Sequence, residues 1–164
     1  MKNRIYLSIA LLLGGAAVAI ASQQARFSSG HASVPLPDNF TVTTRGEDLV
    51  ATFGKDGDHM LELTLLKDLS APGVPAGRAV EFVELQGEKL GVNVSRHGNR
   101  AVLMEGGERS KRNGKTFQAA HWQIAVDNCL FTMTVTAPLP MSKELDAFLG
   151  DPLSTLIQEI SCSP

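Results

Sequence analysis

The sequence of 164 residues contains two cysteines, Cys129 and Cys162, and it lacks the short motifs that mark common enzyme families. It has no G-x-S-x-G nucleophile elbow, glycine-rich phosphate loop, H-E-x-x-H zinc motif or C-x-x-C pair. Lysine and arginine number 15 against 17 acidic residues, so the basic excess of a nucleic-acid-binding protein is also missing. The sequence therefore names no catalytic residue and points first to a compartment and a fold.

The first 21 residues have the features of an export signal. Lys2 and Arg4 precede an uncharged apolar run over residues 5–21, which ends in Ala19-Ile20-Ala21, the small-x-small pattern that signal peptidase cuts. We predict cleavage before Ser22, with retention of the segment as an N-terminal anchor as the alternative. Both outcomes place the folded part outside the cytoplasm. No cysteine follows the apolar run, so the signal is not of the lipoprotein type.

Removal of residues 1–21 takes away two cations and no anions, so the formal charge falls from 15 − 17 = −2 to 13 − 17 = −4. A mature chain of about 140 residues has the size of one ordinary domain. Its polar, glycine-containing start predicts a flexible leader over residues 22–33, followed by a single domain over residues 34–164.

Short segments with a hydrophobic period of two predict an antiparallel sheet of about seven strands. Three of these segments, NFTVTT, LVATF and MLELTLL, are separated by turns at Arg45-Gly46 and at residues 55–58. Four more follow later in the chain: VNVSR, RAVLMEG, TFQAAHWQIAV and CLFTMTVTA. Short connections join antiparallel neighbours, so the last four strands form a meander with one longer basic loop around residues 109–115.

Two helices complete the predicted α+β fold. The first lies between the two groups of strands, where apolar residues from Ala79 to Leu90 recur at helical spacing and Gly91 ends the helix. The second closes the chain with an apolar stripe, and Ser142 and Asp151 suit its N-cap positions. We expect Gly150 to bend or interrupt this closing helix.

The two cysteines are predicted to form a disulfide. Strand alternation places Cys129 at the start of the apolar side of the last strand. The closing helix must bury its stripe against that side, and its length matches the strand, so its end returns to the strand's beginning. In an oxidising compartment a Cys129–Cys162 bridge would pin the tail. Two separate thiols or an intermolecular bridge are the alternatives.

The order of three strands, helix, four strands and closing helix resembles the PsbP-like fold of photosystem II extrinsic subunit P and bacterial DcrB-like periplasmic proteins. The resemblance is carried by VPLPDNFTV, by HMLELTLL before a helix starting at Gly73-Val74-Pro75, by the meander ending in CLFTMTVTAP, and by the closing helix. It covers essentially the whole mature chain. It implies a central antiparallel sheet with helices on its faces, and a role in binding or assembling other proteins rather than in catalysis.

Three short stretches offer candidate chemistry, but an ordinary structural role suits each of them better. Arg96-His97-Gly98 is similar to the motif of phosphohistidine enzymes, yet it falls in a turn of the meander rather than after a strand of a parallel sheet. His121 and Cys129 offer a nucleophile pair, but alternation separates the histidine and the thiol suits a disulfide. The turn at Asp56, Asp58 and His59 supplies too few ligands for a metal site by itself.

The remaining candidate site is the stretch GGERSKRNGKT, which concentrates cations at one hairpin tip of an otherwise acidic domain. Asn113-Gly114 supplies its turn. The candidate partner-binding residues are Arg109, Lys111, Arg112 and Lys115. The loop is either an ordinary solvated connection or an electropositive prong whose arginines make bidentate contacts with an acidic partner.

Two classes of function are compatible with these features. The first is an exported, non-enzymatic, periplasmic protein-binding module, either an envelope accessory factor or an immunity protein that neutralises a delivered toxin. Its partner would be another protein, acidic in character or a toxin, with no cofactor, nucleic acid or stable membrane insertion. The second is a periplasmic enzyme or metal-binding carrier whose site is assembled from distant residues. Export, one disulfide-closed domain and mild acidity favour the first class.

Cleavage of the signal predicts that protein recovered from the cell envelope begins at Ser22. Intact-mass measurement of the wild-type protein should show the loss of residues 1–21. Replacing Ala19 and Ala21 with leucine should block cleavage while leaving export intact, because signal peptidase requires small residues at these positions. Wild-type protein that keeps Met1, with its domain facing outward, would instead identify a retained anchor.

Overall fold

The structure is a computed structural model, and it describes residues 22–28, 30, 32–54, 57–68 and 75–162. The predicted signal segment, Asp56 and the predicted helix start at Gly73-Val74 lie outside these residues. Within the described ranges, no helix has the length and apolar character needed to cross a membrane.

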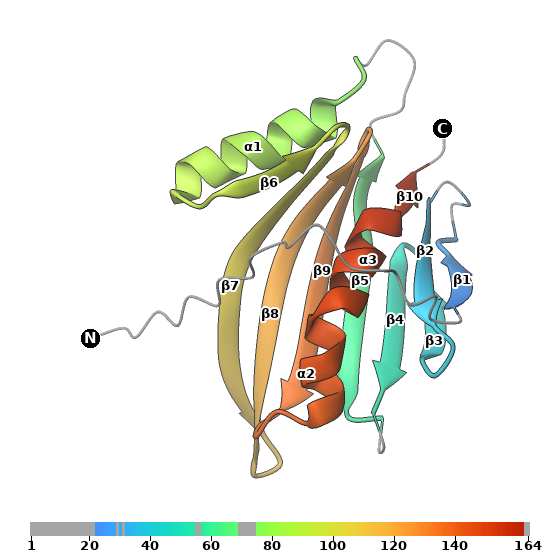
Figure 1. The fold of residues 1–164 in the computed structure, drawn as a ribbon, viewed down its shortest axis with the longest axis vertical. Helices are drawn as coiled ribbons and strands as arrows, with labels where there is room; N and C mark the ends of the chain where they lie inside the picture. The colour runs from blue at the N-terminus through green and yellow to red at the C-terminus, as the bar shows by residue number, and fades with distance from the viewer. Residues whose placement is uncertain (1–21, 29, 31, 55–56, 69–74, 163–164) are drawn as a thin grey trace.

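A seven-stranded sheet with the order β3-β4-β5-β9-β8-β7-β6 forms the centre of the molecule (Figure 1). All of its neighbouring strands are antiparallel. In chain order these strands are β3 (Thr41–Arg45), β4 (Asp48–Phe53), β5 (His59–Asp68), β6 (Val94–His97), β7 (Arg100–Arg112), β8 (Lys115–Val126) and β9 (Cys129–Pro138). The predicted groups of three and four strands are confirmed, and the pairing of β5 with β9 joins them into one sheet.

Alternation along the strands separates an apolar face of this sheet from a more polar one. In β9, Phe131 and Met133 are fully buried, whereas Thr132 and Thr134, which alternate with them, are partly exposed on the other face. The same period of two along β4 and β5 buries leucines and phenylalanine on the apolar face. This face therefore requires a cover, and the rest of the chain supplies it.

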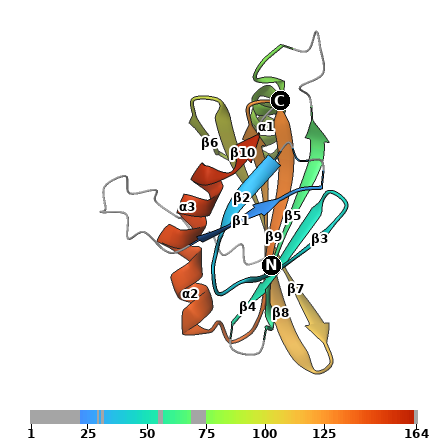
Figure 2. The same cartoon turned by 90° about the vertical axis from the view of Figure 1, so that its right-hand side faces the viewer.

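Helices α2 (Lys143–Leu149) and α3 (Asp151–Glu159) cover the apolar face, and Figure 2 shows them along one side of the sheet. The Ser142 hydroxyl accepts a hydrogen bond from the Leu145 amide at 3.0 Å, which confirms the predicted N-cap. Gly150 separates the two helices, as predicted. Asp151, however, is the first residue of α3 rather than its cap, and an acidic residue in the first turn is favoured by the positive end of the helix dipole.

Helix α1 (Arg78–Leu90) packs on the opposite face, at one end of the sheet (Figure 1). Its buried residues Ala79, Val80 and Val83 contact a small cluster formed by β7, β8 and β9. Gly91 ends the helix in the left-handed conformation, with φ of 65°, as expected for a glycine C-cap. Leu90 was expected on the buried stripe, but it is the last residue of α1, directly before the Gly91 cap, and 52% of its surface is exposed.

The predicted flexible leader contains a strand. β1 (Ser22–Arg26) pairs with β2 (Ala32–Pro37), which also pairs with the short β10 (Ser161–Cys162) in a second sheet. The Gln23 side chain donates to the Phe40 carbonyl oxygen at 2.6 Å, and Phe27 is 2% exposed in the main core. Backbone pairing and one buried aromatic ring therefore order this stretch, although its polar composition favoured a leader.

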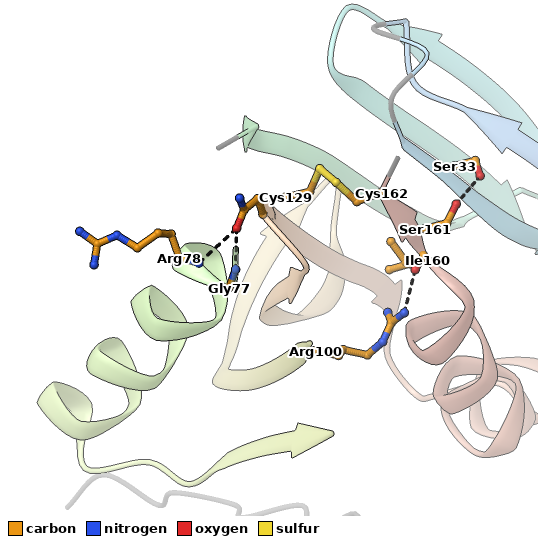
Figure 3. The surroundings of a disulfide bond; sticks show 9 residues. Ser33, Gly77, Arg78, Arg100, Cys129, Ile160, Ser161 and Cys162 are labelled. Atoms are coloured by element: carbon orange, nitrogen blue, oxygen red, sulfur yellow. Dashed lines mark hydrogen bonds between the residues drawn. A yellow bond between two sulfur atoms is a disulfide. The ribbon is translucent and has the colours of Figure 1, made fainter. Parts of the chain in front are cut away.

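The predicted disulfide between Cys129 and Cys162 is present and joins the start of β9 to the C-terminal tail (Figure 3). The two Cα atoms lie 6.0 Å apart and the residues are separated by 33 positions in the sequence. The hydroxyls of Ser161 and Ser33 form a hydrogen bond of 2.8 Å between β10 and β2. The tail is thus attached both to the central sheet and to the small sheet.

Arg100 fixes the end of α3 directly before this tail. Its two terminal nitrogens donate to the carbonyl oxygens of Ile157 at 2.6 Å and Ile160 at 2.9 Å. Burial lowers the pKa of the Arg100 guanidinium, and the Asp127 carboxylate acts in the opposite direction by raising it. A cation at the C-terminus of a helix pairs with otherwise unsatisfied carbonyl groups, so Arg100 stabilises the end of α3.

The turn between β8 and β9 holds helix α1 as well as the tail. The Asn128 side-chain oxygen accepts hydrogen bonds from the amides of Gly77 at 2.8 Å and Arg78 at 3.1 Å. Its side-chain nitrogen donates to the Pro75 carbonyl oxygen at 3.3 Å. Asn128 therefore caps α1 from a distant turn. In most helices the N-cap residue itself, directly before the helix, makes these contacts.

The disulfide predicts a measurable loss of stability in Cys162→Ser. Closing a loop over a separation of 33 residues stabilises a fold by about 3 to 4 kcal/mol on the chain-entropy model. Urea unfolding should show this loss, and reduced wild-type protein is the matched control, which should unfold with the variant. Two reactive thiols in the unfolded, unreduced wild-type protein would contradict the bridge.

The cap of α1 makes a second, local prediction. Asn128→Ala should lower the free energy of unfolding by about 1 to 2 kcal/mol, because two helix amides lose their acceptor. Amide exchange at Arg78 should accelerate more than exchange in the centre of β9. Asn128→Asp keeps an acceptor oxygen and should restore most of the protection. Equal exchange in all three proteins would show that the cap contributes nothing to α1.

Candidate protein-binding site

The β7–β8 hairpin carries the predicted partner-binding cations at the end of the sheet opposite α1 (Figure 1). Arg109, Lys111 and Arg112 lie at the end of β7, and Lys115 begins β8. All of them are exposed. Arg112 lies directly opposite Lys115 in the antiparallel register. The structure therefore brings the four residues together at one tip.

The connection between the strands is a turn of two residues rather than the longer loop predicted from the sequence. Asn113 and Gly114 have φ values of 50° and 76°. Positive φ at both central residues is typical of a type I′ turn, whose twist matches the twist of the flanking strands. The strands consequently stay paired up to Arg112 and Lys115. The cations stand on a regular ladder and not on an irregular loop.

The cations point to both faces of the hairpin. Arg109 and Lys111 are two residues apart and share one face, because side chains alternate along a strand. Arg112 and Lys115 share the other face as a cross-strand pair. In the part of the chain that the structure describes, none of the four forms a salt bridge. Their charges remain available to a partner.

His59, from the turn considered above as a metal-binding stretch, lies in the core with 3% of its surface exposed. Its Nε2 atom is 2.9 Å from the Ser142 hydroxyl oxygen, which also caps α2. Asp58 approaches Nδ1 at 2.8 Å without forming a hydrogen bond. Gly54 is required beside the ring, because a Cβ at this position of positive φ would overlap the imidazole. His59 thus connects β5 with the start of α2.

The other motif histidines also have structural surroundings. His97 and Arg100 flank a turn, as predicted, and Arg96 forms a 2.7 Å ion pair with Glu84 of α1. His121 Nδ1 lies 3.0 Å from the Thr134 hydroxyl on the more polar sheet face. Within the described ranges, no three His, Cys, Asp or Glu side chains are grouped in a way that could hold a metal ion.

Helix α1 carries an exposed apolar strip that was not predicted from the sequence. Phe82 is 41% exposed and Leu85 is 62% exposed, on the side of the helix turned away from the sheet. A shallow groove of about 540 Å³ lies nearby. Its lining residues are Glu84, Gly87, Glu88, Gly91, Val92, Asn93 and Val94. The spacing of three positions between Phe82 and Leu85 could have identified this strip, because it places both residues on one face of the helix, apart from the buried stripe.

No protein-family model matches the chain, and no curated protein matches it in sequence. Solved structures do resemble it. A protein from Bacteroides thetaiotaomicron aligns with a TM-score of 0.58 and 13% identity over 86% of this chain and 48% of the other, so the chain spans about half of that protein. Cyanobacterial PsbP from Synechocystis sp. PCC 6803 aligns with a TM-score of 0.39 and 11% identity, covering 92% and 98%.

LpqN, which is involved in cell envelope biogenesis of Mycobacterium tuberculosis, aligns with a TM-score of 0.45 and 11% identity, covering 88% of this chain and 91% of LpqN. At such identities the likeness concerns the fold alone. The protein is an α+β domain, and its main sheet follows the order of three strands, helix, four strands and closing helices on which the resemblance to the PsbP-like fold was based.

Proposed function

We propose that this protein is an exported, non-enzymatic accessory factor of the periplasm that binds an acidic protein partner through the β7–β8 hairpin. The supporting observation is the group of four exposed cations at the tip, none of which pairs with a carboxylate among the described residues. The chain as a whole carries a formal charge of −2. A cationic tip on an acidic domain favours one orientation of approach toward a negatively charged surface.

The rigidity of the hairpin supports the same proposal. Arg109 and Arg112 are presented by paired strands, with a two-residue turn beyond them. Binding therefore orders side chains but little backbone, which lowers the entropic cost of association. The planar guanidinium group of each arginine can hold a carboxylate through two parallel hydrogen bonds.

Replacing Arg109, Lys111 and Arg112 with serine tests the proposal. The mature wild-type domain should capture its partner from an envelope extract, and the variant should capture much less at low salt. The difference should shrink as salt rises, because charges separated by more than about 8 Å are screened at physiological ionic strength. Thermal midpoints should agree, since the substituted residues are exposed.

The matched control replaces Arg26, Arg45 and Lys143 with serine. These residues are also exposed but lie on β1, β3 and α2. The control removes the same formal charge from other surfaces and should leave capture unchanged. Equal loss in both variants would show that net charge alone matters. Undiminished capture by the hairpin variant at low salt would move the binding surface elsewhere.

A further inference from the structure

The outer edge of β7 is unpaired near the hairpin. β6 pairs with β7 only from Val94 opposite Leu103 to His97 opposite Arg100, whereas β8 pairs along the other side of β7 as far as Arg112. Figure 1 shows β6 beside the end of β7 near α1 and not beside the rest of it. Among the described residues, no backbone hydrogen bond reaches this edge beyond Leu103. The unpaired stretch covers residues 104–112.

The turn determines which backbone groups face this edge. In a hairpin with a two-residue turn, the residues flanking the turn exchange two backbone hydrogen bonds, and hydrogen-bonded pairs then alternate with non-bonded ones. Arg112 and Ser110 therefore direct their amide and carbonyl groups to β8. Lys111 and Arg109 direct theirs outward. The outward backbone groups thus belong to two of the proposed partner-binding residues.

A second copy of the chain does not suit this edge. Two β7 edges pairing with each other would place Arg109 and Lys111 of one copy beside cations of the other, and like charges across a strand pair repel. Charged side chains and β-bulges are the usual means by which edge strands avoid self-pairing, and β7 has a bulge between Met104 and Gly106. The cations on this edge therefore disfavour pairing between two copies of the chain and favour pairing with an acidic strand.

We propose that residues 107–112 of β7 accept an added antiparallel strand from the acidic partner, with carboxylates at alternate positions opposite Arg109 and Lys111. This inference rests on the proposed function and names the form of the ligand. Residues directly opposite each other in paired strands share a face, so a carboxylate-x-carboxylate spacing matches the two cations. Backbone hydrogen bonds supply affinity in such strand addition, and alternate side chains supply specificity.

The other edge of the main sheet is a weaker candidate for this partner. β3 spans Thr41–Arg45, and Arg45 is its single cation. Asp48 lies directly opposite Arg45 on β4, so the local charge is balanced. The β7 edge combines outward backbone groups with two cations on one face, whereas β3 has only one cation.

The test uses two short synthetic peptides at low salt. One alternates threonine and glutamate, and the other has the same composition with its glutamates grouped at one end. Titration into isotope-labelled wild-type protein, followed by NMR, should show about tenfold tighter binding of the alternating peptide. The amides of Arg109 and Lys111 should become protected from exchange, while the amide of Ser110 should already be protected in the free protein.

A pair of variants separates backbone pairing from charge. Arg109→Ser and Arg109→Pro both remove the cation, but proline also removes the outward amide without breaking the ladder to β8. Arg109→Pro should bind the alternating peptide about tenfold more weakly than Arg109→Ser. Should the proline variant fail to fold, N-methylation of the peptide's glutamates removes the facing donors instead. N-methylation of its threonines, whose amides point away, is the control.

The results distinguish a failure of strand addition from a failure of the proposed acidic partner. Equal binding of both peptides, together with equal affinity for Arg109→Ser and Arg109→Pro, would overturn strand addition and leave an electrostatic tip. Equal effects of N-methylation at the glutamates and at the threonines would overturn it as well. Failure of both peptides to bind wild-type protein at low salt would overturn the acidic partner and the added strand together.

Discussion

Three consecutive residues in the turn between β8 and β9 hold one end of the molecule together. The Asp127 amide donates to the Asn99 carbonyl oxygen at 2.8 Å, and its carboxylate accepts from the Asn99 side chain at 3.0 Å. Asn128 caps α1, and Cys129 binds the tail through the disulfide. Asp127 adopts φ of 52°, a left-handed conformation that aspartate tolerates better than most residues. The helices on the two faces of the sheet therefore depend on one turn.

The contacts that hold the helices and the tail are therefore grouped at one end of the molecule, whereas the other end carries the exposed hairpin. α1, the C-terminus of α3 and the disulfide all lie where β9 begins. At the far end of the same strands, the β7–β8 hairpin has no comparable cross-links among the described residues. Its rigidity comes from its own ladder and its type I′ turn. Under the proposed function, substitutions at its tip should therefore weaken binding and leave the core intact.

The parts of the fold that sequence could predict are those governed by local periodicity. The period of two in CLFTMTVTAP identified β9 and the face of Cys129, and the length of the closing helix then predicted the disulfide. Strand β1 escaped prediction because it is ordered by pairing with β2 and by the buried ring of Phe27. The cap from Asn128 escaped because it joins residues about 50 positions apart. Local composition and periodicity do not indicate contacts between residues that are so far apart in the sequence.

The free edge of β7 is also a consequence of distant packing. α1 must lie over Ala101 and Leu103 to bury Val80 and Val83, and it ends at Gly91, so the chain enters β6 only at Val94. β6 runs antiparallel to β7, and extending it toward the hairpin would require residues that already belong to the helix. The burial of α1 therefore shortens β6 and leaves residues 104–112 of β7 unpaired. If β7 accepts an acidic strand as proposed, the cations on that exposed stretch would oppose pairing between copies and favour the partner, so one set of side chains would serve solubility and selectivity together.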